Sequence, residues 1–497
     1  MKQAGILLPI TALPSDYGVG TLGKSAFSFV DFLARAGMKI WQVLPLLPTG
    51  YGDSPYQACA ADALNYYLID LELLEKEGLL ERSDYADLDW GNDPKRVDYE
   101  RLFSKRVQIL RLAFARFDRK NGAWKAFLKE GKYANFAVFM SLKNRFSYLS
   151  WQDWEQEYRE YDEARIEQYK RENADDIAFW QFTQYAFLKQ WQSLKAYANA
   201  RGVEIMGDMP IYLAADSVEA WKEREKLFLT DEKGEFSVVA GVPPDAFSAD
   251  GQLWGNPVYD WVQMKKDGYA WWKARIDYAF TLFDIVRIDH FRGFDRFYAI
   301  PAGAETAKEG EWLDGPKAEL FVGREGLKIV AEDLGIIDDG VRELLRQTGY
   351  PGMKVLEFAF DGNPENEYKP SRFTNGNCAA YTGTHDNLPL RGYIEGLSEN
   401  ERRAFERTLK EECRLLGVRY VGKNAKTLTR TAVRLLLASK ANLVILPMND
   451  VLALGGETRI NFPSTLSKEN WSYRFAREDF SYSVAGWLRK YAKRNGR

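Results

Sequence analysis

A charged pair inside an apolar segment is the first feature of this 497-residue chain that could do chemistry. The segment FDIVRIDH (283–290) carries Arg287 and Asp289 two residues apart. Side chains alternate along a strand, so both would lie on the same face. Burying such charges is costly, and a hydrophobic pair would often be no less stable. The pair therefore indicates either a structural ion pair or the end of an active-site strand.

Three further acids follow other apolar segments: Asp208 in MGDMPIY, Glu332 in VAEDLG and Asp386 in TGTHDNLP. Each acid alone is better explained as a helix cap or an ion-pair partner. Four of them in corresponding positions favour an active site. Carboxyl groups are the working groups of glycosidases, and retaining enzymes place two of them about 5–5.5 Å apart.

The sequence also suggests how these acids would divide the work. Arg287 is expected to hold the pKa of Asp289 down, which suits a nucleophile that must be ionised. Glu332 is expected in drier surroundings that raise its pKa, which suits a general acid. Its neighbour Asp333 would point to the opposite face. Asp386 would bind sugar hydroxyls, with His385 as a hydrogen-bond donor.

Eight short segments rich in Val, Ile and Leu are expected to form the strands that carry these residues. They are residues 5–10, 39–46, 203–210, 283–290, 327–334, 354–360, 378–385 and 442–449. Near-continuous apolar runs are typical of parallel strands buried on both faces. Amphipathic helical patterns, such as SAFSFVDFLARAG and NERRAFERTLKEECRLLG, lie between them. The alternation predicts a (β/α)8 TIM barrel, in which the carboxyl ends of the strands carry the chemistry.

The spacing of these segments predicts one catalytic barrel domain, 1–497, with two large insertions after the second and third strands. Residues 47–202 are rich in Trp, Tyr and charge and are expected to form an inserted, mostly helical subdomain. Residues 211–282 contain GVPPDAFSADGQLWGNPVYDW, full of turn-forming residues around Trp254. Long ordered connections in enzymes are usually lids or binding walls.

Composition limits the class of protein. Hydrophobic residues make up 46% of the chain, charged residues 28%, and the net charge is −3. This balance predicts no nucleic-acid partner, and no apolar run approaches the roughly 18 residues that a membrane span needs. The N-terminus is interpreted as a core strand of a cytoplasmic protein, and three scattered cysteines fit a reducing compartment. Two histidines exclude sites with several imidazoles around zinc, so neither a metal nor another cofactor is predicted.

GVGTLGKS (18–25) offers a different function, because it matches the phosphate-binding pattern G-x-x-x-x-G-K-[ST]. A phosphate loop begins where the first strand ends, whereas TALPSDY intervenes here. Nucleotide binding would also leave the acids without a role. A glycine-rich loop that leads into a helix is the better interpretation.

Taken together, these motifs resemble the 4-α-glucanotransferases (amylomaltases and disproportionating enzymes), glycoside hydrolase family seventy-seven of the α-amylase clan. The similar segments span essentially the whole chain in the same order. They are GVGTLGKS, SPYQ (54–57), GDMPIYLAADSVEAW, GVPPDAFSADGQLWGNPVYDW, VRIDHFRGF, AEDLG, GTHDN and RINFPSTLSKENWSYR.

The resemblance implies roles for individual residues. Asp289 would be the nucleophile, Glu332 the acid/base and Asp386 the transition-state stabiliser. Other residues would surround the sugar: Tyr56, Asp208, Arg287 and His385 at subsite −1, Trp254 on a covering loop and Asn461 at a further donor sugar. The family also implies that no β-sandwich follows the barrel. Asn449 and Ser464 depart from the pattern, in which Gln and Gly are usual.

The expected activity is transfer of a segment of a 1,4-α-glucan to the 4-hydroxyl of an acceptor glucan or glucose. Maltooligosaccharides, amylose and glucans derived from starch or glycogen would be the partners, and the protein would be a monomer or weak homo-oligomer. A hydrolase would use the same three acids, so those acids cannot distinguish water from sugar as the acceptor. A non-catalytic glucan-binding protein would not need a nucleophile and an acid together.

Overall fold

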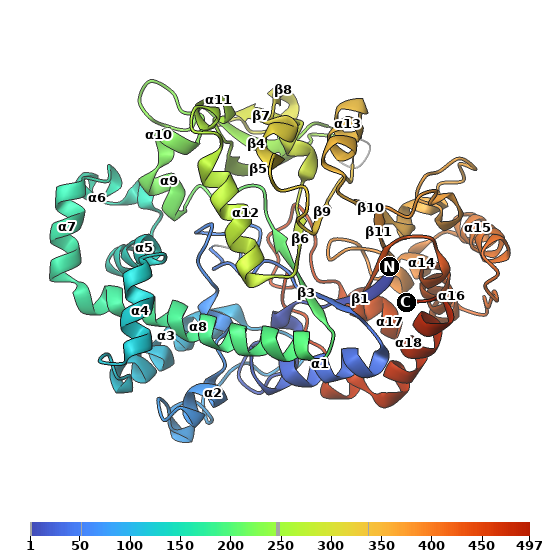
Figure 1. Cartoon of the computed structure of the whole chain (residues 1–497), viewed down its shortest axis with the longest axis horizontal. Coiled ribbons are helices and arrows are strands. Elements are labelled where there is room, and N and C mark those ends of the chain that lie inside the picture. Colours follow the sequence, from blue (N-terminus) through green and yellow to red (C-terminus); the bar gives the residue numbers. More distant parts are fainter. Residues whose placement is uncertain (1, 51, 245–248, 336) are drawn as a thin grey trace.

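Eight parallel strands close into a barrel in the computed structural model, which describes residues 2–50, 52–244, 249–335 and 337–497. The barrel strands follow one another in chain order around the closed sheet (Figure 1). They are β1 (Gln3–Leu7), β2 (Ile40–Gln42), β3 (Glu204–Met209), β6 (Ile285–Ile288), β9 (Ile329–Ala331), β10 (Gly352–Val355), β11 (Cys378–Tyr381) and β12 (Leu443–Pro447). The predicted (β/α)8 barrel is confirmed, and each of the eight apolar segments contains or overlaps a strand.

The clearest difference in bounds concerns residues 354–360. Strand β10 ends at Val355, and Leu356–Phe360 forms a 3-10 turn. Leu356 and Ala359 are buried in that turn. A short apolar run indicates that a segment is buried, but its periodicity alone cannot distinguish a strand from a buried turn.

Helices surround the barrel as the amphipathic patterns predict. Helix α1 (Lys24–Ala36) buries Phe29, Val30 and Leu33 and ends at Gly37, whose φ of 72° is the left-handed conformation that glycine adopts most readily. Helix α15 (Glu399–Leu415) begins at a capping box formed by Ser398 and Glu401. Further helices outside the two long connections are α13 (Asp339–Thr348), α14 (Leu390–Gly396), α16 (Ala425–Ala438), α17 (Met448–Leu452) and α18 (Tyr482–Arg494). No strand follows β12 in the part of the chain that the structure describes.

The connection between β2 and β3 is helical and aromatic. It contains α2 (Leu71–Lys76), α3 (Tyr99–Arg116), α4 (Gly122–Glu130), α5 (Ala134–Arg145), α6 (Gln156–Arg159), α7 (Glu163–Glu172) and α8 (Ala174–Ala200). Trp180 and Trp191 of α8 are fully buried, as is Trp151 before α6. The many aromatic residues of this segment therefore form mainly a packed core.

A four-stranded antiparallel sheet lies beside the barrel and was not expected from the sequence. Its order is β5-β4-β7-β8. The connection after β3 supplies β4 (Val238–Val242) and β5 (Gln252–Pro257), together with α9 (Val218–Lys222), α10 (Arg224–Leu227), α11 (Trp261–Lys265) and α12 (Ala270–Leu282). The connection after β6 supplies β7 (Arg296–Pro301) and β8 (Glu311–Asp314). Each connection supplies only two of the four strands, so the sequence of either connection alone does not reveal the sheet.

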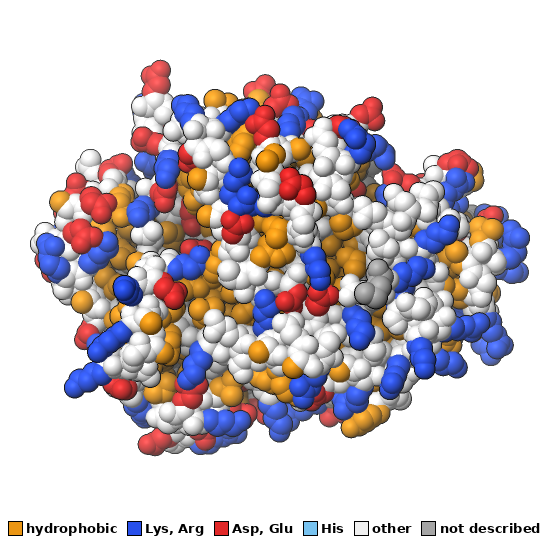
Figure 2. Space-filling model, viewed as in Figure 1, with side chains coloured by type: hydrophobic (Ala, Val, Ile, Leu, Met, Phe, Trp, Pro, Cys, Tyr) orange, Lys and Arg blue, Asp and Glu red, His pale blue; other side chains and the backbone are white. Residues whose placement is uncertain are grey.

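Charge is unevenly distributed although the net charge is only −3. Figure 2 shows basic side chains gathered at the end of the molecule that Figure 1 assigns to α15, α16 and α18. Exposed residues there include Arg407, Lys410, Arg414, Lys426 and Arg430. Among the described residues, no helix combines the length and apolar character needed to cross a bilayer.

Candidate active site

Three neighbouring barrel strands bring three of the predicted acids together. Asp208 lies near the end of β3, Asp289 directly follows β6, and Glu332 directly follows β9. Backbone hydrogen bonds between the neighbouring strands hold these strand ends together. Asp289 N–H donates to the Met209 carbonyl (2.9 Å) and Glu332 N–H to the Ile288 carbonyl (3.0 Å).

Arg287 joins two of these acids. Its Nη1 lies 2.7 and 2.8 Å from the Asp208 carboxylate oxygens and 2.9 Å from Asp289 Oδ1. The Asp208 side chain is completely buried, whereas 26% of the Asp289 side chain is exposed. Tyr56 donates its hydroxyl to Asp208 Oδ2 (2.8 Å). Asp208 is therefore fully occupied by protein donors, and Asp289 is the acid of this group that faces outward.

Burial raises the pKa of Asp289 to about 6, although Arg287 acts in the opposite direction. The expectation that Arg287 would hold this pKa down is therefore wrong for the net shift, because desolvation outweighs the ion pair. Burial, reinforced by the charge of Asp289, raises the pKa of Glu332 further, to about 7. The pKa of Glu332 thus lies above that of Asp289, and near neutral pH one proton can be shared unequally between the two carboxyls.

Glu332 is held by the backbone around it. Its Oε2 accepts from His290 N–H (2.6 Å) and its Oε1 from Leu334 N–H (2.8 Å). His290 itself adopts a left-handed conformation, with φ 49°. Asp333, the neighbour of Glu332, has a different partner, because it accepts from Met353 N–H of β10 (2.6 Å).

Asp386 enters from the turn after β11. Asn461 donates from Nδ2 to Asp386 Oδ1 (2.6 Å) and from its backbone N–H to the His385 carbonyl (3.2 Å). His385 Nε2 lies 3.3 Å from Asp386 Oδ2. The Tyr56 ring stacks on the His385 ring with centroids 5.0 Å apart. Tyr56 thus touches both His385 and Asp208, so it links the two sides of the site.

Trp254 on β5 packs edge-on against the His290 ring, with centroids 4.9 Å apart. Two side-chain amides anchor this strand to the loop that carries Tyr56. Gln57 and Asn256 donate to each other at 3.1 and 3.0 Å. Trp254 therefore lies over the residue that follows Asp289. Residues 245–248 of the GVPPDAF motif lie outside the described residues.

Several residues of the site were given no role from the sequence. Burial lowers the pKa of His290 to about 3, with the Arg292 charge adding to the effect, so its imidazole is neutral. The pairing of Gln57 with Asn256 could not be foreseen, because nothing in either motif points to the other. The Asp–His dipeptide at 289–290 was the only available signal for His290.

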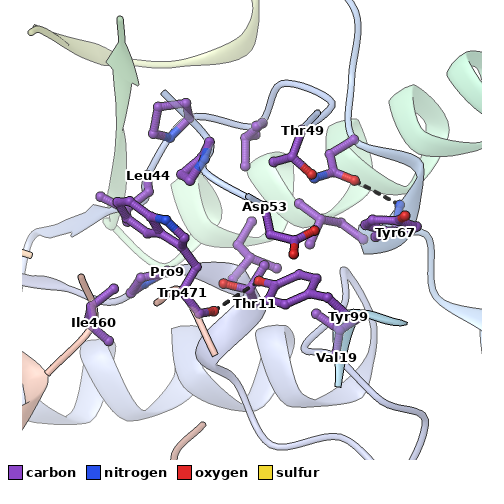
Figure 3. A pocket seen from close by; sticks show the side chains of 16 residues that line it. Pro9, Thr11, Val19, Leu44, Thr49, Asp53, Tyr67, Tyr99, Ile460 and Trp471 are labelled. Carbon is purple, nitrogen blue, oxygen red and sulfur yellow. Dashed lines mark hydrogen bonds between the residues drawn. The ribbon is translucent and has the colours of Figure 1, made fainter. Parts of the chain in front are cut away.

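A small hollow and a far larger groove lie near these residues. Figure 3 shows the small hollow, whose lining residues include Asp53, Tyr67, Tyr99 and Trp471. Its volume of about 30 Å³ admits water but not a sugar ring. Trp471 closes it and contacts Tyr56 and His385, with ring centroids 5.8 Å away in both cases. The larger hollow is a groove of about 1110 Å³ between the helical insertion and the C-terminal loops. Its walls are formed by residues of 48–67, 91–103, 139–148 and 466–470.

The first loop does not form a phosphate site. A side chain at Gly23 would meet Asp70 Oδ2 at 1.9 Å, and one at Gly20 would meet the Ile10 carbonyl at 2.0 Å. Asp70 already accepts from the Thr21 hydroxyl (2.6 Å). Protein atoms, one of them a carboxylate oxygen, thus occupy the space beside these glycines, and a carboxylate there repels phosphate. The glycines allow close packing of this loop, which agrees with its interpretation as a glycine-rich loop that leads into a helix.

The two positions that depart from the family pattern have different surroundings. Asn449 is buried, donates to the Thr458 carbonyl (3.1 Å), and lines a small cavity with Thr384 and His385. Ser464 is exposed and has a φ of 61°, in the left-handed region that favours glycine. Glycine is therefore the usual residue at this position because it adopts this backbone conformation most readily.

A closed parallel barrel with acids and a buried arginine at the carboxyl ends of its strands has the architecture of the (β/α)8-barrel enzymes. The family model described as 4-alpha-glucanotransferase matches residues 8–479. The chain belongs to the 4-α-glucanotransferase family.

Individual relatives agree over the full length. The 4-alpha-glucanotransferase of Clostridium butyricum is 41% identical over 499 residues, which cover 98% of this chain and 99% of the relative. That of Thermus thermophilus is 40% identical over 504 residues, covering 99% and 98%. Among solved structures, the amylomaltase from Streptococcus agalactiae in complex with acarbose superposes with a TM-score of 0.94, at 38% identity and complete coverage of both chains. These likenesses favour a transferase over a plain hydrolase.

Proposed function

We propose that this enzyme transfers 1,4-α-glucan segments by a retaining double displacement in which Asp289 is the nucleophile and Glu332 the acid/base. The observation that carries the proposal is the ordering of the two carboxyl groups. Asp289, paired with Arg287, has the lower pKa, and Glu332 has the higher. A nucleophile must be ionised while its partner holds a proton, and this ordering provides that state.

The first step breaks the glycosidic bond. The Asp289 carboxylate attacks the anomeric carbon, and Glu332 gives its proton to the departing sugar oxygen. A covalent glucosyl–Asp289 ester remains, and Glu332 is now ionised. In the second step Glu332 removes the proton from the acceptor 4-hydroxyl, whose oxygen attacks the anomeric carbon and releases Asp289. Protons balance over the cycle, and the configuration is inverted twice.

The remaining residues would bind and distort the sugar at subsite −1. Asp386, held by Asn461, can accept hydrogen bonds from two sugar hydroxyls, and such bonds strengthen as the ring flattens in the transition state. His385 and Tyr56 would supply donors and a flat wall, while Asp208 would fix Arg287. No step requires a metal or another cofactor.

The substrates proposed are maltooligosaccharides and longer α-glucans such as amylose. The groove of about 1110 Å³ has the volume for several sugar units, and Gly52 and Asp53 of its lining belong to the loop that carries Tyr56. In this proposal residues 1–497 are one catalytic domain. Its inserted parts, 47–202 and 211–282, supply binding walls around the barrel mouth.

The pKa values predict a narrow pH profile. Activity requires Asp289 ionised and Glu332 protonated, so kcat/KM should rise as the pH increases through about 6 and fall as it increases beyond about 7. The two apparent pKa values in this profile describe the pair of carboxyl groups and not either residue alone, since the two groups interact. The measurement is kcat/KM for maltotriose from about pH 4 to about pH 9. A rate that stays level up to the alkaline limit would argue against Glu332 as the acid.

Incubation with pure maltotriose tests transfer itself. The expected products are glucose, maltopentaose and longer chains, with little net gain of reducing ends. The ester must survive until a sugar hydroxyl arrives, although water is far more concentrated. Selection for sugar must therefore come from binding and orientation of the acceptor. Chain lengths are resolved by chromatography, and reducing ends are counted in the same samples.

The same assay on W254A examines the covering strand. Trp254 lies over His290, so its loss should open the site to water and raise the share of glycosyl groups that is hydrolysed. Tyr482, an exposed aromatic residue on α18, provides the control Y482A, for which the product pattern should be unchanged.

The outcome that would contradict transfer concerns the wild-type enzyme. If it releases one new reducing end for each bond broken, it is a hydrolase.

A further inference from the structure

Glu357 is a carboxyl group beside the active site that the proposed mechanism does not use. It lies in the 3-10 turn Leu356–Phe360 that follows β10. Its Oε1 accepts a hydrogen bond from Asn387 Nδ2 (3.1 Å). Its Oε2 is buried and has no hydrogen-bond partner among the described residues. A buried carboxylate with one oxygen unsatisfied costs stability, so it needs another explanation.

Asn387 connects Glu357 to the turn that carries Asp386. Its Oδ1 accepts from Thr384 N–H and from the Thr384 hydroxyl, both at 2.9 Å. The Thr384 Oγ1 in turn accepts from Asp386 N–H (3.2 Å). Because Thr384 donates twice to one end of the amide, the amide nitrogen must face Glu357, and an ionised carboxylate can only accept. Thr384 and Glu357 therefore favour the same orientation of the Asn387 amide, and Glu357 holds its nitrogen end.

The same turn is held on its other side by a different segment. Arg459 donates to the Asp386 carbonyl, and Asn461 donates to the Asp386 carboxylate. Residues 384–387 are thus clamped between the turn after β10 and residues 459–461. If the bond to Glu357 is lost, only one side of the clamp remains.

We propose that Glu357 is a positioning residue that acts through Asn387 to hold the Thr384–Asn387 turn, and with it the Asp386 carboxylate, in the geometry that the transition state requires. The proposal rests on the role given to Asp386 in the proposed function. It assigns Glu357 no contact with substrate. Misplacing a group that acts mainly in the transition state lowers kcat more than it raises KM.

The pKa of Glu357 provides a way to distinguish a positioning role from a stabilising one. Burial, the largest influence, raises this pKa to about 7. Among the charged groups around it, Asp450 raises the pKa and Arg459 lowers it. A carboxyl whose pKa is higher in the folded than in the unfolded state destabilises the fold progressively as the pH rises between those two values. Removing the charge should therefore raise the melting temperature most at alkaline pH, and this gain should disappear as the pH falls below about 4, where the carboxyl is protonated in both the folded and the unfolded state.

Two replacements of similar length distinguish the possibilities. E357Q keeps an acceptor for Asn387, whereas E357M removes it and keeps the apolar volume. With maltotriose we expect kcat of E357M to fall by about tenfold or more, with KM within about threefold, while kcat of E357Q stays within about threefold of wild type. At alkaline pH neither variant should melt below the wild type. E395M is the matched control, because Glu395 is exposed on α14 and, among the described residues, forms an ion pair only with Arg391.

N387A completes the experiment as a double-mutant cycle. If Glu357 acts through Asn387, E357M/N387A should be no slower than N387A alone. Wild-type kcat in E357M overturns the proposal, as does an equal loss in E357Q and E357M accompanied by lower melting temperatures. Full additivity in the cycle overturns it as well. Should the wild type prove to be a hydrolase, the proposed function fails, but the same comparison of hydrolytic kcat still tests the positioning role.

Discussion

Replacing Asp289 by Asn is expected to reduce turnover of maltotriose by about 10⁴-fold or more, as losses of covalent nucleophiles do. The amide is close in shape and can still accept from Arg287, which lies 2.9 Å from the carboxylate oxygen. It cannot form the glucosyl ester, so the double displacement has no first step. Transfer and hydrolysis should fall together, because both pass through the same ester.

Binding should survive this change. The sugar contacts proposed for Asp386, His385 and Tyr56 do not involve Asp289, so the affinity for a long maltooligosaccharide, measured by calorimetry, should stay within about tenfold of wild type. D277N, on the outer surface of α12, is the control, since the one ion pair of Asp277 within the described part of the chain is with Arg324, at 2.6 Å. If D289N retained more than a few per cent of wild-type turnover once contamination was excluded, Asp289 could not be the nucleophile.

Replacing Glu332 by Gln should give the second largest effect, a loss of about 10³-fold or more with ordinary glucans. A sugar leaving group needs a proton, and the side-chain amide of E332Q cannot supply one. Fluoride leaves without protonation, so the first step with α-glucosyl fluoride should be nearly unaffected. The measurement is a burst of fluoride release matching the enzyme concentration.

The fate of the ester provides a further readout in E332Q. Acceptor sugars need a base, so the ester should accumulate and be visible as a mass increase of one glucosyl unit. Azide, which attacks without base catalysis, should release it as glucosyl azide. E332Q that is as slow with the fluoride as with maltotriose would indicate that Glu332 serves structure and not proton transfer. Its carboxylate does accept two backbone N–H bonds, so this alternative is a real one.

The strands of the barrel were predictable because their signal is local. Each buried parallel strand needs a short, nearly continuous apolar run, and all eight runs can be seen within windows of a few residues. The helices were predictable for the same reason, as α1 and α15 show. The sheet β5-β4-β7-β8 was not, because it combines strands from two connections and several of its residues are exposed. The two connections are separated in sequence by β6, so no short window contains both halves of the sheet.

The sequence by itself determined the kind of chemistry: acids at corresponding strand ends, an arginine two residues before one of them, and a barrel that brings strand ends together. The tertiary structure alone decided how those groups behave. Arg287 makes two of its contacts with Asp208, and burial lifts the pKa of Asp289 despite the ion pair. The link from Glu357 through Asn387 to the Asp386 turn joins residues 30 positions apart. Desolvation and contacts between distant segments depend on the packing of the whole chain, which no short window of sequence records.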